Sequence, residues 1–181
     1  MGRLIAAPAL DVLAVEAGGV RLGPAELGPV HWIGAFPGEI AALAERFPSP
    51  GWPAPNCSRV AGGVRAIWSG LGQALVLGPL PAVQGAAVVD QTDAWAALTL
   101  EGPAHREVLS RLCAVDLRDA AFPVDGTART LLGHVSVSLT RTGPDAWLVL
   151  APRSMARTVW EDLEAAIGRL IARGPGPSGS V

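Results

Sequence analysis

The residues from Trp95 to Cys113 constrain the fold most, because they predict a strand, a tight turn and a helix in direct succession. From Trp95 to Glu101 the side chains alternate between two faces, which is the pattern of a half-buried strand. The more apolar face carries Ala96, Leu98 and Leu100. Gly102-Pro103 ends the strand, because proline has no backbone N–H to donate to a neighbouring strand. Proline suits the first turn of a helix, so a helix is expected from Pro103 to about Cys113, packed back on the strand.

Two further regions have the pattern of β-hairpins. The predicted strands are 64–68 and 74–77 in the first hairpin, and 131–139 and 146–150 in the second. In strand 131–139 the alternation places Leu131, Gly133, Val135, Val137 and Leu139 toward the core. Strand 146–150 is almost continuously apolar, so it is expected near the centre of a sheet. Gly70 and Gly143 in the two turns lie 73 residues apart, which indicates an internal duplication of the hairpin unit.

The C-terminal part of the chain predicts a long amphipathic helix. It begins after the cap residue Ser154 and ends near Ala172. Its apolar stripe includes Trp160 and Leu163, so the helix is expected to cover a sheet through these two side chains.

Strand pairs that alternate with amphipathic helices favour an α+β fold. We expect an antiparallel or mixed sheet with helices on one face, built from ferredoxin-like β-β-α units. A single domain is expected over residues 1–173, with a less regular N-terminal part at 1–60. Residues 174–181 are rich in Gly, Pro and Ser and are expected to form a flexible tail.

Composition excludes several classes of function. Half of the 181 residues are apolar and 17% are charged, which predicts a folded core rather than a disordered chain. The net charge of −2 gives no basis for binding nucleic acid or an anionic membrane surface. The sequence shows no signal peptide and no apolar run of the ~20 residues that a membrane span needs, so a cytoplasmic protein is expected. All fourteen basic residues are arginine, which excludes Schiff-base chemistry by lysine.

Five of the six tryptophans are assigned either to the core or to a candidate partner surface. Trp52 lies in the proline-rich segment 48–55, which cannot be helical, so it either anchors this loop or contacts a partner. Because tryptophan is enriched in interface hot spots, Trp52 and Trp95 are the candidates for such a contact. The tryptophans assigned to the core are Trp68, Trp147 and Trp160.

No stretch of the sequence predicts a self-sufficient active site. A G-x-S-x-G elbow and a P-loop are missing, and no group of residues has the spacing of metal ligands. The histidines, His31, His105 and His134, lie far apart and are interpreted as exposed or hydrogen-bonded rather than catalytic. The cysteines, Cys57 and Cys113, are expected as unlinked thiols, and no cofactor or metal is expected on this chain.

Asp90 and Asp93 form a carboxylate pair at the start of the Trp95 strand. The pair could bind a cationic group or act as a base, but turn residues that accept backbone N–H bonds are the favoured interpretation. A ligand site here would need an arginine nearby, and Arg129 or Arg141 could supply it.

Several segments resemble one protein family in order along the chain. The segments are WPAPN, RAIWSGLGQALVLG, DQTDAWAALTLEGPAHREVLSRLCAVDLRDAAF and ARTLLGHVSVSLTRTGPDAWLVLAPRSMARTVWEDL. Together they cover roughly residues 50–166 and resemble the gamma subunit of heterotetrameric sarcosine oxidase, which is itself similar to the folate-binding aminomethyltransferase of the glycine cleavage system. The Asp90 stretch looks like the segment that opens the strand–helix unit of that family, so an aminomethyltransferase-like fold is implied.

The resemblance also implies a function for the complex. Such an enzyme oxidises sarcosine to glycine and hydrogen peroxide and passes the one-carbon unit to tetrahydrofolate. FAD, FMN and NAD are expected on the alpha and beta subunits, and zinc on the delta subunit. The gamma subunit is an accessory subunit that docks on these partners.

Two hypotheses therefore follow from the sequence. The first is an accessory subunit of a sarcosine oxidase complex. The alternative is an independent folate- or one-carbon-binding domain, for which Asp90 and Asp93 are the candidate folate contacts.

Overall fold

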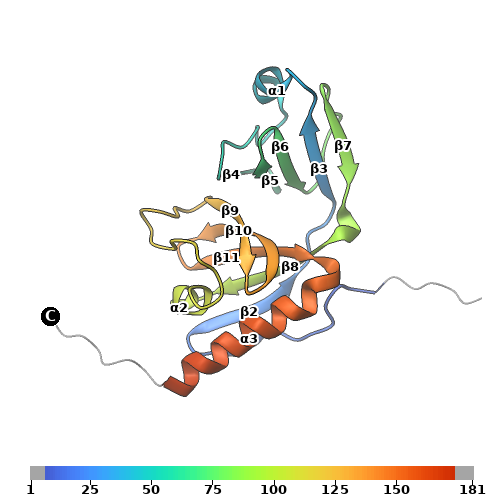
Figure 1. The fold of residues 1–181 in the computed structure, drawn as a ribbon. Helices are drawn as coiled ribbons and strands as arrows, with labels where there is room; N and C mark the ends of the chain where they lie inside the picture. The colour runs from blue at the N-terminus through green and yellow to red at the C-terminus, as the bar shows by residue number, and fades with distance from the viewer. Residues whose placement is uncertain (1–6, 174–181) are drawn as a thin grey trace, which may run out of the picture.

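The computed structural model of the protein describes residues 7–173, which form two antiparallel β-sheets and three α-helices (Figure 1). Sheet A consists, in spatial order, of β1 (Val15–Ala17), β2 (Val20–Ala25), β8 (Trp95–Glu101), β11 (Ala146–Pro152), β10 (Val135–Gly143) and β9 (Thr127–Leu132). Sheet B consists of β4 (Ser58–Ala61), β5 (Val64–Gly70), β6 (Gln73–Leu77), β3 (Val30–Ala35) and β7 (Ala86–Asp90). The helices are α1 (Ile40–Arg46), α2 (His105–Leu109) and α3 (Ala156–Arg173). The expected α+β class is confirmed, and β11 lies inside sheet A as its apolar sequence predicted.

The elements form four layers (Figure 1). α2 and α3 cover one face of sheet A, and the largest hydrophobic core lies beneath them. The other face of sheet A packs against sheet B through a smaller core that includes Leu75 and Leu150. α1 covers the far face of sheet B, where Leu43 and Phe47 pack with Ile33. The expected sheet with helices on one face corresponds to sheet A, and sheet B supplies the opposite face.

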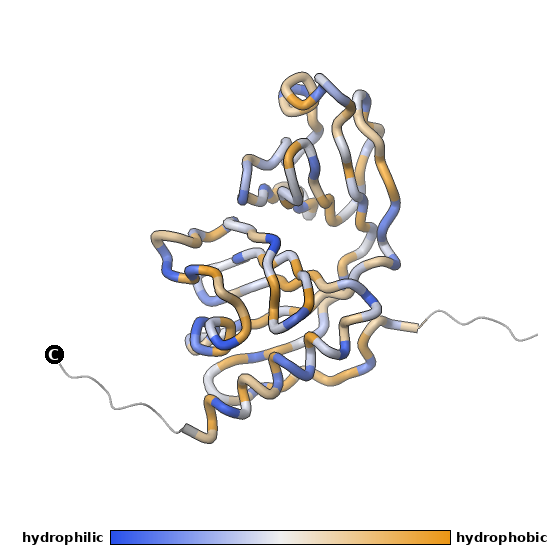
Figure 2. Tube along the Cα trace, in the orientation of Figure 1, coloured by the Kyte–Doolittle hydropathy of each residue, from blue (hydrophilic) through white to orange (hydrophobic). Residues whose placement is uncertain are grey.

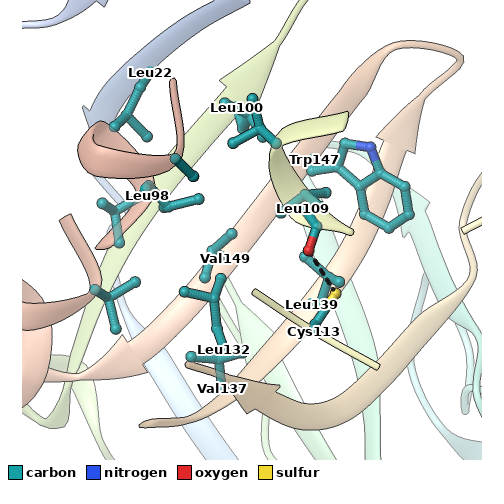
Figure 3. Packing of buried hydrophobic residues seen from close by; sticks show 14 of the residues in the cluster. Leu22, Leu98, Leu100, Leu109, Cys113, Leu132, Val137, Leu139, Trp147 and Val149 are labelled. Carbon is teal, nitrogen blue, oxygen red and sulfur yellow. Dashed lines mark hydrogen bonds between the residues drawn. The ribbon is translucent and has the colours of Figure 1, made fainter. Parts of the chain in front are cut away.

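The strand predicted at Trp95 is confirmed residue for residue as β8. The alternating side chains of β8 contribute to two cores, because Leu98 and Leu100 face α2 and α3 while Ala97 faces sheet B. Figure 3 shows Leu98 and Leu100 in the larger core with Leu109, Leu139 and Trp147. Burying a side chain of this size stabilises the fold by roughly 1.5–3 kcal/mol, so β8 is held by its neighbours on both sides.

The duplication that the hairpins indicate extends over a longer unit. In each sheet a strand and a helix precede a meander of three strands, and the first strand pairs with the last, as β3-α1-β4-β5-β6 and β8-α2-β9-β10-β11. The two hairpins change register at Gly70 and Gly143, the two glycines that lie 73 residues apart. The strand that precedes each unit in the sequence pairs with the first strand of the other unit, because β2 pairs with β8 and β7 pairs with β3. Each sheet is therefore completed by a strand that precedes the other unit.

The strand predicted at 131–139 is wrong. These residues belong to two strands, because Gly133 and His134 form the turn between β9 and β10. Gly133 has a φ of +58°, a left-handed conformation that glycine adopts without steric cost. The turn reverses which residues face the core, so Leu131 is 56% exposed and Leu132 is fully buried. The glycine occupied an inward position in the alternating pattern, which concealed the turn.

The two predicted helices correspond to α2 and α3, with different bounds. The helix expected from Pro103 to Cys113 is shorter, because α2 ends at Leu109 and turns follow, in which the amide of Cys113 donates to the carbonyl of Leu109. α3 confirms the C-terminal helix, with Trp160 and Leu163 buried against sheet A. Ser154, the expected cap, lies inside a 3-10 turn at Arg153–Met155 that precedes α3.

The N-terminal part expected to be less regular contains β1, β2, β3 and α1. It supplies strands to both sheets. The expected tail at 174–181 lies outside the described residues.

Candidate functional site

A small pocket lies between the two sheets, where β9 and β10 face β5 and β6. Its volume is about 220 Å³, and we call it the inter-sheet pocket. The residues that line it are Trp32, Ser69, Leu75, Gln91, Trp95, Arg129, Ser136, Val137 and Ser138. It therefore combines two indole rings, one guanidinium and three hydroxyls.

The polar wall of this pocket comes from the alternation of β10. Val135 and Val137 belong to the core under the helices, so Ser136 and Ser138 point toward sheet B. The hydroxyls of Ser138 and of Ser69 on β5 are buried and have no hydrogen-bond partner among residues 7–173. Buried polar groups normally have a partner, so these two hydroxyls are available to a water molecule or to a polar ligand group.

Arg129 and Trp95 have partners of their own at the edge of the pocket. Arg129 Nη1 donates to the carbonyl of Ser69 over 3.1 Å, and Trp95 Nε1 donates to Gln91 Oε1 over 3.0 Å. The pocket is smaller than the ~300–1,000 Å³ of ordinary small-molecule sites. It contains no nucleophile with an adjacent base, so its residues support binding of a small polar group rather than covalent chemistry.

Asp90 acts as a turn residue, which was the favoured interpretation. Its Oδ1 accepts bonds from the backbone N–H of Thr92, over 2.9 Å, and from the Thr92 hydroxyl, over 2.7 Å. These bonds lower the pKa of Asp90, the backbone bond most of all, because they favour the carboxylate. Thr92 in turn accepts the N–H of Val30, so the motif fixes the crossing from β7 to β8.

Asp93 is exposed in the 3-10 turn at Thr92–Ala94. Neither Asp90 nor Asp93 lines the inter-sheet pocket, and neither forms an ion pair with Arg129 or Arg141 in the described part of the chain. The Asp90 carboxylate is therefore engaged within its own turn and does not line the inter-sheet pocket.

The two candidate interface tryptophans occupy different environments. Trp52 is half-buried, and its ring packs edge-on against Phe47 with ring centroids 5.1 Å apart. Trp95 is also half-buried, and besides the inter-sheet pocket it lines an open groove of about 570 Å³ with Leu10, Leu27 and Arg153. Trp95 thus joins two concave surfaces of the molecule, whereas Trp52 contacts the α1 side of sheet B.

A cluster of polar groups around the buried side chain of Arg141 was missed by sequence reasoning. Arg141 on β10 is 4% exposed, and its guanidinium donates to the carbonyls of Phe122, Gly143 and Pro144. It also pairs with Asp119 over 2.6 Å, and this bond is the main reason that the pKa of Asp119 is lowered. Nothing in the local sequence distinguishes Arg141 from an exposed arginine, because Phe122 and Asp119 come from a distant loop and the other two acceptors are backbone carbonyls.

His105, next to this cluster, is a buried histidine with both nitrogens occupied. Trp147 Nε1 donates to its Nδ1 over 2.6 Å, and its Nε2 lies 3.3 Å from Asp145 Oδ1. Burial lowers its pKa, and the positive charges of Arg106 and Arg141 act in the same direction. The neutral form with the proton on Nε2 satisfies both contacts, so His105 serves the fold and has no free nitrogen for catalysis.

The remaining polar candidates stay apart. His134 lies in the exposed β9–β10 turn, and His31 lies on β3 with a buried Nδ1 that has no partner in the described residues. Cys57 and Cys113 are both free thiols. Between residues 7 and 173 no cluster of His, Cys, Asp and Glu could hold a metal ion, and no helix is long and apolar enough to cross a membrane.

Comparison with known proteins identifies the fold. The family model of the GCVT N-terminal domain matches residues 70–172, which include β8, α2, the second meander and α3. In a solved structure titled heterotetrameric sarcosine oxidase from Corynebacterium sp. U-96 in complex with pyrrole 2-carboxylate, one chain superposes with a TM-score of 0.75. It is 24% identical, and the match covers 93% of this chain and 91% of that one. The fold is therefore that of a GCVT-type domain.

Similarity to individual relatives identifies the family of the chain. The chain is 31% identical over 149 residues to the sarcosine oxidase subunit gamma of Arthrobacter sp., and the match spans 82% of this chain but only 61% of that relative. It is 32% identical over 154 residues to the sarcosine oxidase subunit gamma of Corynebacterium sp. strain P-1, covering 76% of this chain and 74% of that relative. The chain belongs to the family of sarcosine oxidase gamma subunits.

Proposed function

We propose that this chain is the accessory gamma subunit of a heterotetrameric sarcosine oxidase. Its role is to dock on the alpha, beta and delta subunits and so support the oxidative demethylation of sarcosine to glycine, with one-carbon transfer to tetrahydrofolate. The observation that carries the proposal is the 32% identity to a gamma subunit across 74% of that relative. In this proposal FAD, FMN, NAD, tetrahydrofolate and zinc belong to the partner subunits, and the complex is cytoplasmic.

The chemistry of the described residues supports an accessory role. His105 has both nitrogens engaged, and the inter-sheet pocket holds hydroxyls and a guanidinium without a base beside them. The two free thiols accord with a reducing compartment. Trp95, at the junction of the inter-sheet pocket and the open groove, and Trp52, beside α1, remain the proposed partner contacts.

Co-expression tests the proposal. The alpha, beta and delta subunits are produced with and without this chain, and both the yield of assembled complex and the rate of sarcosine oxidation are measured. We expect both to fall without the chain. Equal yield and equal rate in the two preparations would refute the accessory role.

A binding measurement tests the folate alternative separately. The isolated chain is titrated with tetrahydrofolate, and Asp90→Ala is compared with Asp93→Ala. We expect no saturable binding to the wild-type chain at micromolar ligand. Micromolar affinity that Asp90→Ala abolishes would favour the folate-binding domain instead.

A further inference from the structure

The outer strand of sheet B has an open hydrogen-bonding edge. Among residues 7–173, β7 pairs with β3 alone, from His31↔Asp90 to Ala35↔Ala86, and Figure 1 shows no labelled strand on its other side. The amide of Gln91 donates to the carbonyl of Val30, and the amide of Phe36 donates to the carbonyl of Gly85. These bonds fix the alternation of the ladder, so residues 85, 87, 89 and 91 bond toward β3. The backbone groups of Ala86, Val88 and Asp90 therefore point away from the sheet.

β7 lacks the features that normally protect an edge strand. Proteins block such edges with charged side chains, proline, bulges or very short strands. β1 has three residues and includes Glu16, β4 includes Arg59, and β9 includes Arg129. β7 has the sequence AAVVD, with regular pairing and its one charge at the end. Of the four edge strands in the described part of the chain, β7 is the one without such a feature in its interior.

The side chains of β7 are apolar and exposed on both faces of the sheet. Val88 lies opposite Ile33 on the α1 side, and Val89 lies opposite Trp32 on the side of sheet A. They are 42% and 45% exposed, and Figure 2 shows this apolar stretch along the outer edge. Phe36, at the end of the neighbouring β3, is 50% exposed and extends the apolar surface. Exposed apolar side chains on both faces of an unpaired edge strand favour pairing with another chain.

We propose that the free edge of β7 pairs with an extended segment of a partner subunit, which adds a sixth strand to sheet B. This inference rests on the proposed function, because it assigns the docking surface of the gamma subunit. The partner segment carries apolar side chains beside Val88 and Val89 and a basic residue beside Asp90 and Asp93. A second copy of this chain fits less well, because β7 has no basic residue to offer these carboxylates.

The substitution Val88→Pro tests the pairing. The N–H of Val88 faces outward, so proline removes a donor from the free edge and leaves the β3 ladder intact. Val88→Thr is the matched control, because threonine keeps the N–H and favours strands. Assembly with alpha, beta and delta is measured by co-purification, and thermal melting of each isolated variant checks the fold. We expect roughly tenfold weaker assembly for Val88→Pro and near wild-type assembly for Val88→Thr.

Hydrogen exchange gives a readout that needs no substitution. In the isolated wild-type chain the amides of Val88 and Asp90 should exchange rapidly, and assembly with the partners should slow them at least tenfold, as strand pairing protects amides. Assembly of Val88→Pro at wild-type strength, or unchanged exchange at Val88 in the complex, would overturn the inference and leave the proposed function standing. A wild-type chain that fails to assemble would refute both. Dimerisation of the isolated chain that Val88→Pro abolishes would assign the edge to a second copy and overturn the inference.

Discussion

Trp147 Nε1 donates a hydrogen bond of 2.6 Å to Nδ1 of His105, and both side chains are buried. The bond requires an unprotonated Nδ1, so it selects the neutral imidazole with its proton on Nε2, facing Asp145. Protonation of His105 would place an N–H against the indole N–H and a positive charge beside Arg106 and Arg141. The pair therefore links the packing of α2 on β11 to the ionisation of one histidine.

This link predicts a pH dependence of stability. The pKa of folded His105 lies below its ordinary value of 6.5, chiefly because burial disfavours the imidazolium. As the pH falls below 6.5, the unfolded chain takes up a proton that the folded chain does not, so the free energy of unfolding falls. Above that pH the imidazole is neutral in both states and its contribution is constant. In His105→Gln this part of the slope should disappear, as measured by urea denaturation between pH 5 and 8. Parallel curves for the two proteins would contradict the assignment.

Arg141→Leu should destabilise the chain by roughly 3 kcal/mol. The substitution removes the donor for the carbonyls of Phe122, Gly143 and Pro144, and it leaves Asp119 without its buried partner. Chemical denaturation measures the loss. Arg118→Leu is the matched control, because Arg118 is exposed and pairs with Asp116 at the surface. Equal stability of the two variants would show that the bonds of buried Arg141 contribute nothing to stability.

Alanine substitutions at Gly133 and Gly168 should change the stability of the chain in opposite directions. Gly133 has a φ of +58° and a Cβ there would lie 2.7 Å from Asp162 Oδ2, so Gly133→Ala should cost about 1–2 kcal/mol. Gly168 lies inside α3 with nothing within 4 Å of an added Cβ, so Gly168→Ala should stabilise by about 0.5–1 kcal/mol. Thermal melting resolves the two signs. A stabilising Gly133→Ala would mean that the β9–β10 turn has another conformation.

Leu163→Ala should cost roughly 2–5 kcal/mol, because the side chain is fully buried between α3 and sheet A. Ile171→Ala on the same helix is the control, because Ile171 is 52% exposed and should lose less than about 0.5 kcal/mol. Urea denaturation of both variants measures the difference. A small loss at Leu163 would refute the packing of α3 on sheet A.

The sequence by itself determined the elements whose signals are local. β8 and α3 follow from the periodicity of their own residues, and the Asp90 turn follows from the hydrogen-bonding capacity of its side chain. The glycines 73 residues apart also indicated that the two hairpins are alike, and both hairpins change register at these glycines. Local periodicity failed at Gly133, where a two-residue turn preserved the alternating appearance of a single strand, and it made the helix expected from Pro103 too long.

Tertiary structure alone decided how these elements combine. β2 pairs with β8 in sheet A, and β7 pairs with β3 in sheet B. The alternation of apolar and polar residues does not predict these partners, because it is compatible with several strand pairings. The same holds for the burial of Arg141, because Phe122 and Asp119, which bond to it, lie in a distant loop. The free edge of β7 is likewise invisible in its sequence, since being an edge depends on which strand lies on the other side. Backbone hydrogen bonds between distant strands set the arrangement of both sheets. Such bonds are not specified by the residues of either strand.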